Sequence, residues 1–250
     1  MLRQTWILTR NDLRQEARNF EVVVTAGFFT VVILAMYAVG FAALSEEVQP
    51  RVLPGMLWIG VAFTGVLTLT RVFDREREAD TLRALLAAPV ERMAIYASKL
   101  VVTLLVMAVC AAIMVPGLAY LFPGGSTLTA SPLATFALVF AGCLGYAAVG
   151  TLFAAGLATS SGKNVLLSLI LYPLTTPVLL LALVATQRLM QGHPGLTGTI
   201  GQMYVVDAAL LALGALLFES VLVGTRPATA RGADRARAAA PTSGAKEGEP

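Results

Sequence analysis

The chain has 250 residues, of which 57% are hydrophobic and only 13% are charged, and its mean hydropathy is +0.76. Soluble domains have about 45–50% apolar and about 25% charged residues, so this composition excludes an ordinary soluble enzyme and indicates a membrane protein. Two cysteines and one histidine exclude a disulfide framework, a cysteine-based metal cluster and a multi-histidine metal site. The net charge is +3, and the charges form blocks between long apolar runs.

Residues 1–21 are the first predicted element. Apolar or small side chains recur there at near-helical spacing, with charged residues between them: Leu2, Trp6, Thr9, Leu13, Ala17 and Phe20. This pattern predicts a cytoplasmic amphipathic helix on the inner membrane surface, with Trp6 at the interface. A solvated helical tail is the alternative.

Six apolar runs follow, and each can cross a bilayer as a helix, since about 20 residues rising about 1.5 Å each span the hydrocarbon core. The first is too long for a signal peptide, so we expect a retained helix. The predicted fold class is therefore an all-α membrane protein with six transmembrane helices. The spans are predicted at residues 22–44, 52–70, 100–122, 132–158, 164–185 and 203–224.

The basic residues are distributed unequally between the two sides of these spans. Sixteen of the 18 lie on one side, and only Arg51 and Arg188 lie on the other. Because positive loops stay in the cytoplasm, both termini are predicted to be cytoplasmic. Residues 225–250 contain no apolar period, which predicts a disordered cytoplasmic tail.

The loop at residues 71–99 joins the second and third spans. It carries six basic and five acidic residues, and several opposite charges stand three residues apart, which favours a helix. The second span is therefore predicted to continue as a helix into the cytoplasm. Leu82, Leu85 and Leu86 add a short apolar face, and Pro89 is predicted to end that helix. Such a helix can transmit a push from a cytoplasmic partner; a solvated loop that only sets the topology is the alternative.

Residues 76–92 read ERE-x-x-TL-x-x-LL-x-x-PV-x-R and resemble the cytoplasmic loop of ABC-2 type transporter permeases. In that family the loop couples the membrane helices to an ATP-binding subunit, so the resemblance implies an ATPase-coupling loop here. The usual motif has Gly before the TL pair and an acid after it, where this chain has Asp80 and Arg83. The coupling positions implied by the resemblance are Glu76, Glu78, Leu82, Leu85, Leu86, Pro89 and Arg92.

Stretches in the second, fifth and sixth spans narrow the resemblance. They are PGMLW and RVF at residues 54–58 and 71–73, YPLTTPV at 172–178, and DAALLALGALLFESVL at 207–222. Together with the loop, they are similar to the haem-exporter protein B family, CcmB. This resemblance implies a non-catalytic permease subunit of an ABC transporter in the bacterial inner membrane, required for cytochrome c biogenesis and the delivery of haem to a periplasmic chaperone.

The partners that the resemblance implies are the ATP-binding subunit CcmA, the subunits CcmC and CcmD and, indirectly, the haem chaperone CcmE. ATP would be bound by the partner, because residues 156–164 (GLATSSGKN) lack the spacing of a phosphate-binding loop. Haem is then a ligand that is transported or handled, and no cofactor, metal or nucleic acid is expected to be bound by the chain. An ABC-2 exporter of a drug, lipid or glycan and a non-transporting membrane scaffold are the alternatives.

Polar and helix-breaking residues within the spans are further candidates. Asp207 and Glu219 are placed near the two ends of the sixth span, where we expect capping, snorkelling or a bond to a neighbouring helix, with the transport path or a partner interface as the alternative. Pro173 and Pro177 are predicted to kink the fifth span. His193, in an outer loop, is expected to be exposed, with haem ligation as the alternative.

Small residues in the third and fourth spans are expected to serve packing. Cys110 and Cys143 are interpreted as small apolar fillers. The fourth span also carries a stripe of small residues that lets helices approach closely, which predicts internal packing, with a homodimer contact as the alternative. The stripe consists of Gly142, Gly145, Gly150, Ala154 and Ala158.

Overall fold

The structure is a computed structural model that describes residues 2–78, 91–158 and 164–224, and the regular elements in these ranges are all helices. Within the described ranges, six helices are long and apolar enough to cross a membrane. The prediction of an all-α membrane protein with six spans is confirmed. Only the backbone is described for Glu76, Glu78, Arg92 and Glu219.

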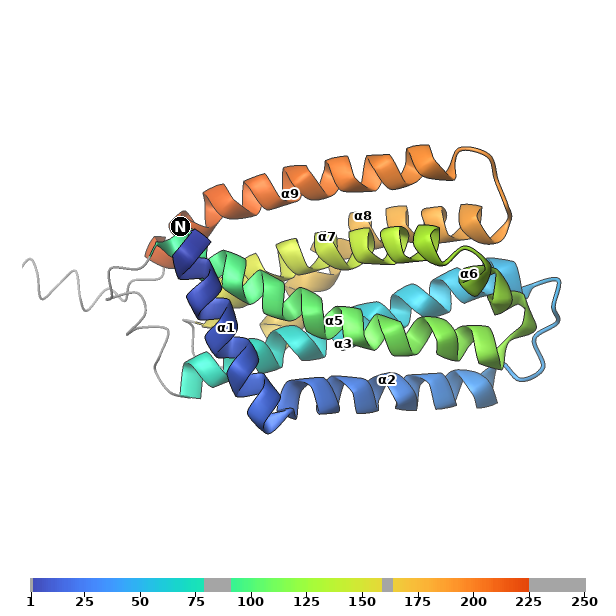
Figure 1. Ribbon diagram of the computed structural model, residues 1–250, viewed down its shortest axis with the longest axis horizontal. Helices are drawn as coiled ribbons and strands as arrows, with labels where there is room; N and C mark the ends of the chain where they lie inside the picture. Colours follow the sequence, from blue (N-terminus) through green and yellow to red (C-terminus); the bar gives the residue numbers. More distant parts are fainter. Residues whose placement is uncertain (1, 79–90, 159–163, 225–250) are drawn as a thin grey trace, which may run out of the picture.

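The long helices run side by side, and α1 lies across them near one end (Figure 1). The short elements η1 and α6 stand at the opposite end, between α5 and α7. The helices are α1 (Leu2–Asn19), α2 (Glu21–Gly40), α3 (Gln49–Glu78), α5 (Arg92–Leu121), η1 (Pro123–Gly125), α6 (Ser126–Ala130), α7 (Pro132–Ala158), α8 (Asn164–Met190) and α9 (Leu196–Gly224).

The helix ends differ from the ends of the predicted spans. The helix α3 continues to Glu78, as the charge pattern of the loop predicted, whereas α5 already begins at Arg92 and α9 at Leu196. Apolarity identifies the part of a helix that lies in lipid, where every backbone group must be hydrogen-bonded internally. It does not identify helical turns that contain Gly, Thr, Gln or charged residues, so the spanning helices α5 and α9 are longer than the apolar runs that predicted them.

The helix α7 is the centre of the bundle, since it packs against α3, α5, α8 and α9. The helices α2 and α9 lie at the periphery, with 28% and 17% of their span residues buried. The small residues of α7 therefore face several neighbours at once, and the side chains that meet them hold the bundle together.

The helix α1 packs mainly against α5. Phe20 joins α1 to α2 in a left-handed conformation, with φ of 51°, and Glu16 Oε1 accepts a hydrogen bond of 2.9 Å from the Val23 N–H in the first turn of α2. The apolar stripe predicted for α1 does not lie on one side. Thr9 is buried against the bundle, whereas Trp6 is 66% exposed, because the packing on α5 selects a different face of the helix.

Candidate functional site

The carboxyl group of Asp207 lies deep within the transmembrane bundle. The prediction that Asp207 stands near the outer end of the sixth span is wrong, because α9 begins at Leu196 and Asp207 lies at the middle of the apolar stretch Leu196–Phe218. The residue is only 3% exposed, so its carboxyl group does not snorkel to water. Among the described residues, its Oδ2 atom has no hydrogen-bond partner.

Three helices meet at this carboxyl group, because Gly145 of α7 has no side chain. A Cβ atom at Gly145 would collide with Asp207 Oδ1 and would lie 2.8 Å from Val178 Cγ1 of α8. The absence of a side chain thus lets the α9 carboxyl group reach the α7 backbone. A buried polar atom without a partner costs about 1–3 kcal/mol, so this arrangement is not explained by stability.

Trp58 of α3 joins the same layer of the bundle. Its ring occupies the space in front of Gly142 of α7, where an added Cβ would lie within 3.0 Å of three ring atoms. Its Nε1 atom donates a hydrogen bond of 2.8 Å to Thr186 Oγ1 of α8. The Leu69 side chain of α3 packs in the same way against Gly150, a third glycine of α7. The prediction that these small residues serve internal packing is confirmed for Gly142, Gly145 and Gly150.

Tyrosine hydroxyl groups connect further pairs of helices, and none of these tyrosines was predicted from the sequence as a site residue. In lipid each buried hydroxyl group needs a partner, so a tyrosine inside a span was the available signal, although it does not name the acceptor. Among the described residues, four tyrosine hydroxyl groups donate hydrogen bonds of 3.0 Å to backbone carbonyl groups of a neighbouring helix, and the one from Tyr204 lies on the exposed side of the bundle. The bonds are Tyr37 to Met56, Tyr96 to Ala148, Tyr146 to Ala62 and Tyr204 to Ala137.

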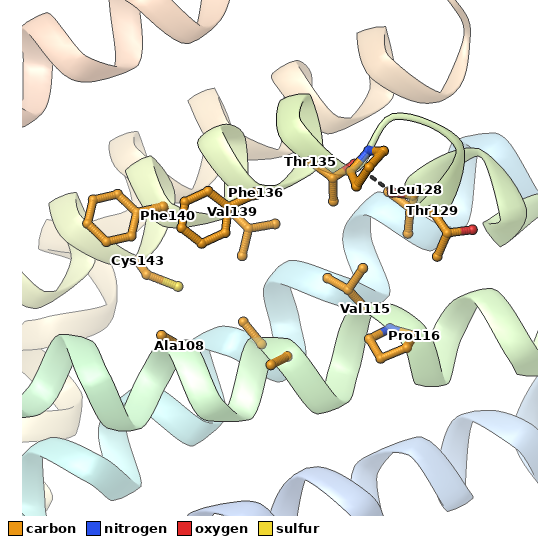
Figure 2. Close-up of a pocket in the computed structure, with 13 residues that line it drawn as sticks. Ala108, Val115, Pro116, Leu128, Thr129, Thr135, Phe136, Val139, Phe140 and Cys143 are labelled. Atoms are coloured by element: carbon orange, nitrogen blue, oxygen red, sulfur yellow. Dashed lines mark hydrogen bonds between the residues drawn. The ribbon is translucent and has the colours of Figure 1, made fainter.

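An apolar cavity of about 290 Å³ lies between α5 and α7, next to α6 (Figure 2). Figure 2 shows Pro116 of α5 on one side and Phe136 and Phe140 of α7 on the other. The Thr135 hydroxyl group donates to the Leu128 carbonyl group at 2.7 Å and is therefore already satisfied. The side chains that line the cavity carry no charge, so it suits an apolar part of a ligand.

Two helical arms leave the bundle on the side where α1 lies. The helix α3 extends to Glu78, and α5 begins at Arg92. The predicted coupling positions Glu76, Glu78 and Arg92 therefore lie on helices that are continuous with the spans. The predicted coupling positions Leu82, Leu85, Leu86 and Pro89 lie outside the described residues, as does the predicted disordered tail, residues 225–250.

The helix α1 is tied to the α5 arm at two points. Gln4 Oε1 accepts a hydrogen bond of 3.2 Å from the Glu91 N–H, just before α5 begins. Asp12 Oδ2 lies 2.9 Å from Lys99 Nζ, and these side chains are only 19% and 6% exposed. The sequence held no signal for these contacts, because each joins residues 87 positions apart.

Asp12→Asn is expected to loosen α1 from α5, because it leaves the Lys99 ammonium group buried without its carboxylate. Removing one partner of a fully buried ion pair costs about 3–5 kcal/mol, and the cost here is smaller because Asp12 is partly exposed. Trypsin should then cleave the purified full chain at Arg10 and Arg14 faster than it cleaves the wild type. The control is Asn11→Ala, because Asn11 is the exposed neighbour of Asp12. Equal cleavage of the two variants would contradict the role of the ion pair between Asp12 and Lys99 in holding α1 on α5.

The remaining candidates are distributed over α5, α7, α8, α9 and the turn between α8 and α9. The helix α8 continues through Pro173 and Pro177, and Glu219 is part of α9. His193 is exposed in the turn between α8 and α9, where Gly192 and Gly195 adopt positive φ angles. Cys110 and Cys143 are free and buried. Within the described residues, no three His, Cys, Asp or Glu side chains come together as metal ligands.

Comparisons with known proteins place the chain in a family. The profile of the CcmB protein family matches residues 3–229. The Heme exporter protein B of Bradyrhizobium diazoefficiens is 28% identical over 216 residues, which cover 83% of this chain and 91% of that protein. The Heme exporter protein B of Paracoccus denitrificans is 31% identical over 168 residues, or 65% of this chain and 73% of that protein. This multi-pass membrane chain therefore belongs to the CcmB protein family.

Proposed function

We propose that this chain is the membrane permease subunit of an ABC-type haem exporter that serves cytochrome c biogenesis. The proposal rests on the family match over residues 3–229, which takes in all six spans. The two similar proteins are both named Heme exporter protein B. The chain would lie in the bacterial inner membrane with both termini in the cytoplasm, the orientation that the basic residues favour.

ATP hydrolysis would take place on a separate subunit, CcmA, docked on residues 76–92. Because α3 and α5 run without interruption from the bundle to this stretch, a displacement of the loop would move both helices. The bonds from Gln4 and Asp12 would carry the same movement to α1. A rigid helical path of this kind is a physical means of coupling the ATPase to the spans.

Haem would be a transported ligand that the chain handles together with CcmC and CcmD and passes to the chaperone CcmE. The cavity between α5 and α7, about 290 Å³, lies just below the range of about 300–1,000 Å³ that holds drug-sized ligands. A haem path at this position would therefore need α5 and α7 to separate. His193 lies in the turn between α8 and α9, which Figure 1 shows at the end of the bundle away from the arms, and its imidazole is a residue that could bind the haem iron.

The test is a haem stain for covalent c-type cytochromes in a strain that lacks this gene. The strain is complemented with the wild-type gene, with Leu86→Asp, or with Ala238→Asp, which adds the same charge in the C-terminal tail. We expect the stained bands to return with the wild type and with Ala238→Asp but not with Leu86→Asp. Membrane levels of each variant are checked by immunoblot.

Two results would contradict the proposal. Normal bands in the deletion strain would exclude the haem-exporter function and favour an exporter of another substrate. Restoration by Leu86→Asp at wild-type levels would exclude ATPase coupling through the loop and favour a membrane scaffold.

A further inference from the structure

The outward side of α1 carries only positive charge. Arg3, Arg10, Arg14 and Arg18 are all exposed, and their spacing of seven, four and four residues places them along one side of the helix. We refer to these four residues as the arginine stripe. Among the described residues, none of the four forms an ion pair with a carboxylate.

The acidic residues of α1 lie on the opposite side and are engaged by the bundle. Asp12 is 2.9 Å from Lys99 Nζ of α5, and Glu16 accepts the hydrogen bond from Val23 of α2. Glu16 is buried and Asp12 is mostly buried. The helix carries acidic and basic residues. In the folded chain its acids face the bundle, so the charged residues on its outward side are all basic.

Large apolar side chains flank the arginine stripe. Trp6 is 66% exposed and Ile7 is 55% exposed. The helix packs against α5 and lies across the flank of the bundle near the end that carries the two arms (Figure 1). A helix lying across the spans, with arginines beside a tryptophan and an isoleucine, has the chemistry of the headgroup region of a bilayer.

We propose that the arginine stripe binds the phosphate groups of anionic phospholipids in the cytoplasmic leaflet, while Trp6 and Ile7 insert among the upper acyl chains. Guanidinium groups bind phosphate oxygens with two parallel hydrogen bonds. Each basic residue near an anionic leaflet contributes about fivefold in affinity. The positive charge of the stripe favours an anionic surface over a neutral one. The exposed Trp6 and Ile7 favour a lipid over an acidic protein as that surface, because their apolar side chains can insert among acyl chains.

The inference concerns the bilayer around α1 and is independent of what the permease carries. The full chain, purified in mild detergent, is titrated with phosphatidylglycerol or with phosphatidylcholine of the same acyl chains, and retained lipid is counted by native mass spectrometry. The test variant is Arg3→Gln/Arg10→Gln/Arg14→Gln/Arg18→Gln. The matched control is Arg226→Gln/Arg231→Gln/Arg235→Gln/Arg237→Gln, which removes the same charge from the C-terminal tail.

We expect the wild type and the tail control to prefer phosphatidylglycerol, and the stripe variant to bind it about 600-fold more weakly, because four losses of about fivefold multiply. The corresponding fourfold lysine variant should keep most of the preference, since it keeps the charge. If the fourfold glutamine variant does not elute as a folded monodisperse protein, Arg10→Gln/Arg14→Gln carries the test with an expected loss of about 25-fold.

Three results would overturn the inference. An equal loss in the stripe and tail variants would assign the preference to net charge alone. An unchanged preference in the stripe variant would remove the arginines from lipid binding. Loss of a co-purifying cytoplasmic subunit from the stripe variant, without any change in lipid binding, would assign the stripe to an acidic protein partner.

Discussion

Gly142→Leu is expected to lower the midpoint of thermal unfolding by about 10 °C or to prevent the folded chain from accumulating. A Cβ atom at this position already overlaps the Trp58 ring. That ring cannot move aside, because it is buried and its Nε1 atom is bonded to Thr186. Overpacking in a close-packed interior costs about 1–3 kcal/mol or more, and each kcal/mol shifts the midpoint by about 2–4 °C in a chain of this size.

The midpoint is measured in detergent by the temperature at which the monodisperse peak in size-exclusion chromatography is lost. Gly201→Leu on α9 is the matched control, since nothing lies within 4 Å of the Cβ position at Gly201. The same substitution should be tolerated there. Equal losses in Gly142→Leu and Gly201→Leu would mean that any glycine-to-leucine change in a span is destabilising, and the assigned packing of Trp58 on α7 would be wrong.

Asp207→Ala is expected to leave the thermal midpoint unchanged or to raise it, although it removes a side chain that is 97% buried. The substitution removes a polar atom that lacks a partner among the described residues and costs about 1–3 kcal/mol, which offsets the lost packing. We expect cytochrome maturation to fall in the same folded variant, because ionisable groups inside a membrane mark substrate or ion pathways. Full activity would give Asp207 a structural role only.

The contact between Asp207 and Gly145 is tested by a double-mutant cycle. Gly145→Ala alone should lower the midpoint, since its methyl group would collide with Asp207 Oδ1. In the Asp207→Ala background the methyl group has that space, although Val178 still limits it. The cost of Gly145→Ala should therefore shrink, and residues in contact show coupling energies of about 0.5–3 kcal/mol. Strictly additive effects would exclude the contact.

Most of the fold follows from the order of apolar and charged residues. A bilayer requires a continuous apolar run for each span, and such runs are local features of the chain, so six spans can be counted without any knowledge of their packing. The extension of α3 into the loop to Glu78 is local as well, since it follows from charges three residues apart. The start of α9 at Leu196 was missed, because the Gly, Thr and Gln residues among its first seven residues interrupt the apolar run.

The candidate site could be predicted only in part. A glycine or alanine every few residues in α7 indicated that something packs closely there, and three of these glycines do face other helices. Which side chain fills each space was not predictable. Trp58 and Thr186 are 128 residues apart, and nothing local to either residue names the other. Asp207 was recognised as costly in lipid, but its position within α9 was misjudged along with the start of that helix.

The membrane class and the number of spans follow from the chain's own residues, because the free energy of placing each segment in lipid depends on that segment alone. The partners in packing and the outward face of each helix required the folded structure. The helix α1 illustrates the difference, since its sequence holds both acids and arginines on an amphipathic helix. Asp12 contacts Lys99, and Glu16 accepts a hydrogen bond from Val23, so both acids face the bundle. Lys99 is far along the chain and Val23 is on the next helix. Because these contacts orient α1, its arginines face outward.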